Sequence, residues 1–267
     1  MALRGKFKLF PIEFYEDRIR TILTSDAPSV DQWIDDIYHD IGHNKSIVGL
    51  DTEWQWNPET QYQEVAVLQL CVGRNCLIYQ LSQSKSIPQS LIKFLGDENL
   101  TFVGKEVCGD VARLARQGLY VKCAMDVAYM AAEKYERMAA EKYKEDIYKD
   151  YKSMGLKTLA MEFLNKEMEK DKKLTRSRWG NERLTYYQVK YACIDAFVSF
   201  QLGIRLQTPY SSEERAKCIA ETKKFCMNAF SSRKSNRKKN HIKKLQEELL
   251  AGIGDFSKIV PTGWDDV

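Results

Sequence analysis

Three short β-rich runs lie close together in the first part of the chain and constrain its fold more than any other feature. The runs are residues 46–51 (SIVGLD), 64–72 (EVAVLQLCV) and 76–81 (CLIYQL), and residues 73–75 (GRN) supply a turn between the last two. β-branched and apolar residues in short runs, bounded by turn residues, are typical of strands. The spacing therefore predicts a three-stranded β-meander.

A helix, a strand and a second helix are predicted directly after the meander. Pro88 opens a helical pattern that stops at Gly96, residues 100–105 (LTFVGK) are typical of a parallel strand, and residues 106–118 again have helical spacing. Alternation of strands and helices indicates an α/β fold in which helices are layered on a sheet.

The rest of the folded part is predicted to be helical. Helical patterns cover residues 124–138, 155–165 and 184–206, so the sheet is expected to lie in the N-terminal half of the chain. A near-repeat, AAEKYE at 131–136 and AAEKYK at 139–144, lies in a highly charged stretch. We interpret it as a lengthened, solvated helix in preference to a functional arm.

The charge of the chain is concentrated at its C-terminal end. Residues 208–267 hold 12 Lys and Arg against 8 Asp and Glu, which leaves 29 residues of each sign elsewhere and places the whole net charge of +4 in this part. We predict an N-terminal extension at 1–29, a folded domain at 30–207 and a basic, partly helical or mobile tail at 208–267. The basic run at 231–244 fits nucleic-acid backbone, a nuclear address or a solvated face equally well.

Composition also excludes two classes of protein. No apolar run approaches the roughly 20 residues that cross a bilayer, and the first residues lack a secretory pattern. We expect a soluble protein of the nucleus or cytoplasm, or both, without a membrane partner. The seven cysteines are odd in number and form no C-x-x-C pair, so we expect reduced thiols in the core in place of a disulfide framework or a zinc site.

The first candidate for chemistry is the pair of acids at the end of the first predicted strand. Side chains two apart project from the same face of a strand, so Asp51 and Glu53 can approach one point while Thr52 faces the other way. Two carboxylates beside a core are costly to bury unless a positive group binds them. A solvated strand end is the alternative interpretation.

Further acids come from two predicted helices. Asp110 lies near the start of the helix that follows the parallel strand, where such folds open a crevice. Tyr191 and Asp195 are four residues apart and share one face of the last helix. Each has a simpler explanation: a charge that favours a helix N-terminus for Asp110, and a pair satisfied by backbone groups for Tyr191 and Asp195.

Taken together, the acids indicate a site for hard cations. Carboxylate oxygens without a matching histidine or cysteine cluster favour Mg²⁺ or Mn²⁺ over zinc, and the three histidines fall outside these motifs. Two such ions would stabilise both the attacking water and the leaving oxygen in a displacement at phosphorus. Phosphodiester hydrolysis is the reaction that fits best.

Three motifs carry a family resemblance. GLDTEW at 49–54, GKEVCGDVARL at 104–114 and YACIDAF at 191–197 resemble the exonuclease motifs of the DEDD superfamily, tyrosine subgroup, on an RNase H-like (DnaQ-like) mixed sheet flanked by helices. Further stretches resemble the Werner-type exonuclease domain and its plant relatives, over about 170 of 267 residues. The resemblance identifies residues 30–207 as a 3′-5′ exonuclease domain.

The resemblance implies a role for each motif residue. Asp51 would contact both of two Mg²⁺ or Mn²⁺ ions, Glu53 and Asp195 would hold the ion that activates water, and Asp110 would support the second. Tyr191 would orient the attacking water. The implied reaction removes nucleoside 5′-monophosphates from single-stranded 3′ ends of DNA or RNA, and ring-forming relatives imply a possible homo-oligomer.

Substrate contacts are predicted less specifically. Thr52, Trp54 and Lys105 lie within or beside the motifs, and Trp56 is nearby, where they can stack on or neutralise the terminal nucleotides or simply pack in the core. Lys172 and Trp179 fall in a family-like stretch and are either structural or close to substrate. The alternative function is a catalytically silent nucleic-acid-binding or scaffold protein on the same fold.

Overall fold

The structure is a computed structural model that describes most of the first 207 residues. It covers residues 5–42, 44–142, 151–169 and 171–207, together with 213, 216–220 and 222–224, and for 136–142 it describes the backbone alone. The basic run at 231–244 and the end of the near-repeat at 143–144 lie outside the described residues.

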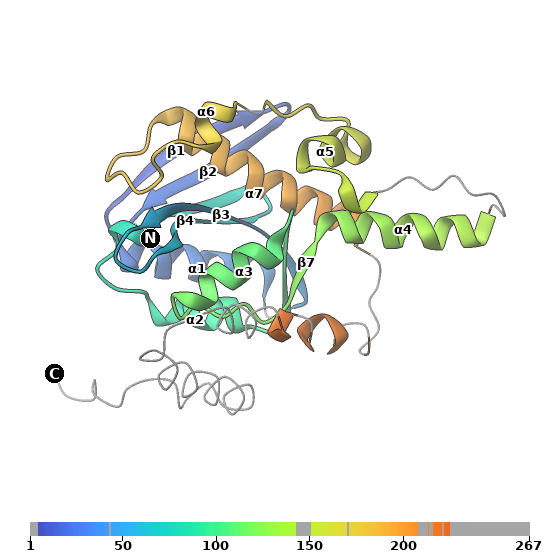
Figure 1. Ribbon diagram of the computed structural model, residues 1–267, viewed down its shortest axis with the longest axis horizontal. Coiled ribbons are helices and arrows are strands. Elements are labelled where there is room, and N and C mark those ends of the chain that lie inside the picture. The colour runs from blue at the N-terminus through green and yellow to red at the C-terminus, as the bar shows by residue number, and fades with distance from the viewer. Residues whose placement is uncertain are drawn as a thin grey trace.

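A seven-stranded mixed sheet forms the centre of the molecule (Figure 1). Its strands are β1 (Phe7–Phe14), β2 (Asp17–Thr24), β3 (Ser46–Asn57), β4 (Tyr62–Val72), β5 (Asn75–Tyr79), β6 (Leu100–Gly104) and β7 (Ala124–Asp126). They are arranged in the order β1-β2-β5-β4-β3-β6-β7. The predicted meander is confirmed, because β3, β4 and β5 pair antiparallel in sequence, and β6 pairs parallel with β3 as expected.

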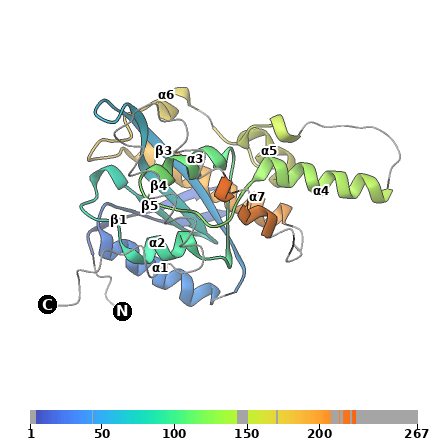
Figure 2. The ribbon, with the colours of Figure 1, turned by 60° about the horizontal axis from the view of Figure 1, so that its bottom comes forward.

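Helices cover both faces of the sheet and enclose two apolar cores (Figures 1 and 2). One face carries α1 (Ala27–Ile41), α2 (Gln89–Gly96) and α3 (Val107–Arg116), and the other α4 (Val127–Lys142), α5 (Leu156–Leu164), α6 (Lys172–Thr175) and α7 (Tyr186–Leu206). Short 3₁₀ turns lie at Leu81–Gln83 and Tyr151–Ser153. The predicted layered α/β, RNase H-like class is therefore confirmed.

The first strands show that the domain starts earlier than the sequence predicted. Residues 1–29 were expected to be an extension outside the domain, but β1 and β2 form a hairpin, and β2 pairs parallel with β5 at the edge of the meander. Ile12, Phe14 and Ile19 are buried in the same core as α7. Their alternation with exposed residues is the strand pattern that the prediction overlooked.

Two differences concern the far edge of the sheet. Residues 124–126 were predicted to begin a helix but form β7, which pairs parallel with β6; all seven strands still lie in the N-terminal half of the chain, as expected. Asp126 ends this strand and accepts a hydrogen bond from the backbone N–H of Ala128 at 2.8 Å, which favours the start of α4. A three-residue strand is too short to be distinguished by its periodicity.

Part of the predicted tail packs against this edge strand. Residues 216–220 and 222–224 are helical, and the buried Thr222 hydroxyl accepts a hydrogen bond from the backbone N–H of Ala124 at 3.0 Å. An edge strand has unpaired backbone groups that a side chain can satisfy. The folded unit thus extends past residue 207, although α7 ends at Leu206 close to the predicted boundary.

The composition-based expectations can be compared with the described residues. Six cysteines form no disulfide among the described residues; five of them are buried, as expected of core residues, and Cys108 is half-buried. Cys226 lies outside the described part. None of the helices in the described ranges combines the length and the apolar composition that a bilayer crossing needs.

Candidate active site

Strand β3 supplies the first two acids. It continues through Asp51 to Asn57 instead of ending at the carboxylate, and its register against β4 shifts between Glu53 and Trp54. Asp51 and Glu53 share the face of Gly49, which lies against α7. Glu53 is buried and Asp51 half-buried, so both carboxylates lie where the strand leaves the core.

Gly49 allows the last helix to approach this strand. A Cβ atom at Gly49 would lie 2.1 Å from the backbone oxygen of Ala196 and 2.8 Å from the backbone nitrogen of Phe200. No side chain fits at these distances, so a glycine is required for β3 and α7 to pack so closely. The close packing brings Asp195, next to Ala196, near Asp51.

Helix α7 presents Tyr191 and Asp195 on one face, as predicted. The helix begins at a capping box in which Thr185 and Gln188 bond each other's backbone N–H groups. The ring of buried Trp179 lies 6.0 Å from that of Tyr191. Burial, followed by the charges of Asp195, Glu53 and Asp51, raises the pKa of Tyr191, so its phenol stays protonated.

Asp110 joins the site from the other side of the sheet. It is buried in the first turn of α3, where it accepts a hydrogen bond from the Thr52 hydroxyl at 2.5 Å. The Arg113 guanidinium lies 3.5 Å from the same carboxylate oxygen. Thr52 faces away from Asp51 and Glu53, as the strand period predicts, and its hydroxyl is directed to Asp110.

The four acids create a strongly unfavourable local charge. Burial is the largest cause that raises the pKa of Asp51 well above its usual value, followed by the charges of Asp110, Asp195 and Glu53. Burial also raises the pKa of Asp110, against the opposing effects of Thr52 and Arg113. Like charges concentrated in this way are costly without a bound cation.

The donors fit a hard divalent cation by their chemistry. Carboxylate oxygens are the ligands that Mg²⁺ and Mn²⁺ prefer. As the side chains stand, however, no three or more His, Cys, Asp or Glu residues within the described ranges are arranged so that they could hold a metal ion. The charges of the other predicted ligands therefore all act on Asp51, but the side chains of the described residues do not form a complete metal coordination sphere.

A groove beside Glu53 contains the predicted tryptophans. Its volume is about 430 Å³, and its lining residues are Glu53, Trp54, Gln55, Trp56, Thr175, Arg176, Ser177, Arg178, Trp179, Gly180 and Asn181. Trp54 is 39% and Trp56 60% exposed, so both have free surface for a ligand. Arg113 stacks on the Trp54 ring, with its guanidinium carbon 5.1 Å from the ring centre. Sequence reasoning missed Arg113, although its i,i+3 spacing from Asp110 is a usable signal.

The remaining candidates for substrate contacts are Lys105, Lys172 and Trp179, and each has a different environment. Lys105 is 16% exposed and forms ion pairs with Asp126 at 3.8 Å and Glu106 at 3.7 Å. Lys172 begins α6. Trp179 is buried, and its indole N–H donates to the Thr175 backbone oxygen at 3.4 Å, so it supports Tyr191 from within the core.

Known proteins share this sequence pattern. The family model described as 3′-5′ exonuclease matches residues 35–209. A protein of Acanthamoeba polyphaga mimivirus, provisionally named 3′-5′ exonuclease R431, is 29% identical over 238 residues, which are 87% of this chain and 56% of that protein. The 3′-5′ exonuclease of Drosophila mojavensis is 28% identical over 181 residues, 66% of this chain and 51% of that protein. The chain thus spans about half the length of these curated relatives.

Solved structures share the fold. RNase D of Escherichia coli matches with a TM-score of 0.58 and 16% identity, covering 78% of this chain and 50% of that one. The catalytic core of RRP6 from Trypanosoma brucei matches with a TM-score of 0.55 and 13% identity, covering 77% and 52%. The matched family model covers most of the described fold and all five motif residues, and the chain therefore belongs to the 3′-5′ exonuclease family of the DEDD superfamily.

Proposed function

We propose that the protein is a metal-dependent 3′-5′ exonuclease that hydrolyses the terminal phosphodiester bond of nucleic acid and releases nucleoside 5′-monophosphates. The observation that carries this proposal is the convergence of Asp51, Glu53, Asp110 and Asp195 from β3, α3 and α7. Membership of the exonuclease family supports it. The tyrosine at 191 favours the tyrosine subgroup, and the Werner-type resemblance belongs to the same proposal.

The acids are the proposed ligands of two Mg²⁺ or Mn²⁺ ions. When bound, such ions supply an activated water and stabilise the leaving oxygen. Asp51 is the central acid, because the charges of Asp110, Asp195 and Glu53 all raise its pKa. Thr52 and Arg113 hold the Asp110 carboxylate in place through the contacts described above.

Tyr191 is the proposed orienting group. A phenol whose pKa is raised by burial and by nearby carboxylates remains a hydrogen-bond donor at neutral pH. It can donate to a phosphate oxygen or orient the attacking water, and it is a poor base. Trp179, packed on its ring, restricts the orientations that it can adopt.

The substrate is proposed to be a single-stranded 3′ end of DNA or RNA. The groove beside Glu53 combines exposed Trp54 and Trp56 with exposed Arg176 and Arg178. Aromatic faces stack on bases and guanidinium groups bind phosphates, so the groove suits the terminal nucleotide. RNase D is described as an exoribonuclease involved in structured RNA processing, which makes RNA a substrate to test beside DNA.

Labelled substrates test the proposal directly. Single-stranded DNA and RNA with a 5′ label are incubated with the protein in Mg²⁺, in Mn²⁺ and in EDTA, beside Asp51→Ala and the control Asp40→Asn. Asp40 is an exposed acid near the end of α1, a helix on the face of the sheet opposite to α7. A metal-dependent ladder that shortens from the 3′ end, absent only in Asp51→Ala, is the expected result.

One observation favours a second function, a silent nucleic-acid-binding protein: the acids do not stand in a metal-binding arrangement within the described residues. In that case neither substrate is shortened with any cation, while the protein still retains one of them in a binding assay. This result would overturn the exonuclease proposal.

A further inference from the structure

A second cavity lies beside helix α7. Its volume is about 380 Å³, within the roughly 300–1,000 Å³ typical of ligand sites. Its lining includes Tyr191 and Asp195 of α7 and Phe14 and Tyr15 of the β1–β2 hairpin. This hairpin precedes residue 35, so Phe14 and Tyr15 lie outside the stretch that the family model matches.

Tyr15 is held at the hairpin turn in a strained backbone conformation. Its φ is 55°, in the left-handed region that glycine and asparagine favour and that a bulky aromatic residue rarely adopts. Its ring is 56% exposed, packs edge-on against Phe14 at 5.0 Å, and its hydroxyl accepts a hydrogen bond from the Glu167 backbone N–H at 2.7 Å. Strain of this kind persists where the surroundings impose it and often marks a functional position.

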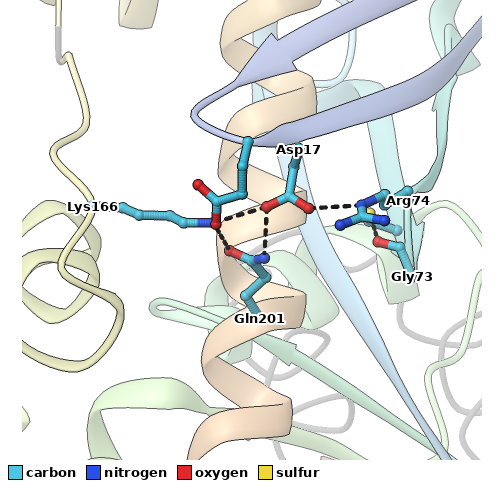
Figure 3. A network of polar contacts seen from close by, with 7 residues as sticks. Asp17, Gly73, Arg74, Lys166 and Gln201 are labelled. Carbon is cyan, nitrogen blue, oxygen red and sulfur yellow. Dashed lines mark hydrogen bonds and ion pairs between the residues drawn. The ribbon is translucent and has the colours of Figure 1, made fainter.

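A buried polar network fixes the turn that carries Tyr15 (Figure 3). Asp17 accepts hydrogen bonds from Lys166 at 2.8 Å, from Arg74 at 2.7 Å and from Gln201 of α7 at 3.2 Å. The side chains of Asp17 and Lys166 are 5% and 9% exposed. The hairpin turn is thereby tied to α7, the helix that carries Tyr191 and Asp195, and the position of Tyr15 relative to them is set.

We propose that Tyr15 and Tyr187 form a stacking site for the nucleobase that precedes the terminal nucleotide, an inference that rests on the proposed exonuclease function. Tyr187 is 68% exposed, lines the same cavity and precedes Tyr191 by four residues, a rise of about 6 Å along the helix. Two exposed aromatic rings in the lining of one cavity suit a flat base, because every base has a face that can stack on an aromatic ring.

Charge indicates which part of a nucleotide enters this cavity. Its described lining includes the acids Glu13, Glu167, Glu169 and Asp171 and the single cation Lys190. Carboxylates repel a phosphate but accept hydrogen bonds from the exocyclic amino groups of cytosine, adenine and guanine. The site therefore takes a base in preference to the backbone, and an amino-bearing base in preference to thymine.

Binding without turnover tests the site by itself. Anisotropy of 5′-labelled (dC)₁₂, (dA)₁₂ and (dT)₁₂ is measured in EDTA for wild type, Tyr15→Asn, Tyr187→Ala and the control Tyr129→Ala. Asparagine tolerates the left-handed backbone at position 15, and Tyr129 of α4 is similarly exposed, at 55%, without lining the cavity. Tyr15→Asn and Tyr187→Ala should weaken binding of (dC)₁₂ and (dA)₁₂ about 5- to 100-fold, the effect of losing one stacked base.

Turnover separates this inference from the function on which it rests. The p-nitrophenyl ester of thymidine 5′-monophosphate lacks the preceding base, so both variants should hydrolyse it like wild type while their kcat/KM on oligonucleotides falls. If wild type cleaves neither substrate but binds (dC)₁₂ more tightly than (dT)₁₂ through Tyr15, the exonuclease proposal fails and the base site stands. If wild type cleaves both and neither variant differs from Tyr129→Ala on oligonucleotides, the base site is overturned.

Discussion

Two groups of buried charged side chains lie beside helix α7, and they differ in the signs of the charges that they bring together. Near the middle of the helix, Asp195 belongs to a group with Asp51, Glu53 and Asp110, and all four charges have the same sign. Further along, Gln201 joins Asp17 and Lys166, whose charges are opposite and 2.8 Å apart. The like charges of the first group repel one another within the folded chain, whereas the charges of the second group compensate one another within the protein.

The pKa directions show the same difference. In the carboxylate group, burial and like charges act together and raise the pKa of Asp51. At Asp17, burial also acts to raise the pKa, but the hydrogen bonds from Lys166 and Arg74 outweigh it and hold the pKa below its usual value. Burial is therefore common to the cluster of like charges and the structural ion pair. The sign of the neighbouring charge is what distinguishes them.

The largest expected effect comes from removing the central charge of the carboxylate group. Asp51→Asn keeps the shape of the side chain but should lower exonuclease activity at least about a thousandfold, because a shared metal ligand is lost. In EDTA the same variant should unfold at a higher urea concentration, because three like charges lose their partner. A loss of activity together with a loss of stability would contradict the comparison.

Removing the positive charge of Lys166 from the second group, that of Asp17, Lys166 and Gln201, should lower the stability of the fold and leave the activity nearly unchanged. Lys166→Met leaves Asp17 with less positive charge in a buried place and should lower the free energy of unfolding by about 3–5 kcal/mol. Equilibrium urea unfolding measures it. Asp17→Asn in the same background should recover part of the loss, because the uncompensated carboxylate is then gone. Hydrolysis of the nucleotide p-nitrophenyl ester at low temperature should stay near the wild-type rate.

An intermediate effect is expected where a neutral side chain supports the carboxylate group. Thr52→Val has nearly the same shape but cannot donate to Asp110, so the acid loses the hydrogen bond that orients it. Activity should fall about 10- to 100-fold, mainly in kcat. Thr52→Ser keeps the hydroxyl and serves as the control; equal losses in both variants would show that the methyl group matters and the hydrogen bond does not.

The smallest effect is the pH dependence of the compensated group. The pKa of Asp17 lies below its ordinary 3.8, so its contribution is present above that value and is lost as pH falls through the lowered pKa. Burial opposes the charge of Lys166, but hydrogen bonds to Asp17 and Glu16 raise its pKa above 10.5, so its contribution is lost as pH rises through the raised pKa. The stability difference between wild type and Lys166→Met should be constant from about pH 5 to 9 and should shrink below pH 3.8 and above pH 10.5.

Local patterns in the sequence determined most of the central fold. The meander, the parallel strand β6 and the helices α2, α3, α5 and α7 follow from residue periodicity and from Pro and Gly boundaries, and each is present. The strand period and the helical turn also placed Asp51 with Glu53, and Tyr191 with Asp195. Such relations involve only neighbours along one element, so a single sequence contains them.

Relations between elements were decided by the tertiary structure. The hairpin β1–β2 joined the sheet, and residues 124–126 became a strand, because partners far away in the chain satisfied their backbone groups. The hydrogen bond from Thr52 to Asp110, the close approach of α7 at Gly49 and the cavity beside Tyr15 likewise depend on contacts across long sequence separations. The sequence by itself thus determined which acidic and tyrosine side chains share a face of one strand or one helix, and packing decided what surrounds them, because a side chain's surroundings depend on which distant elements the core brings together.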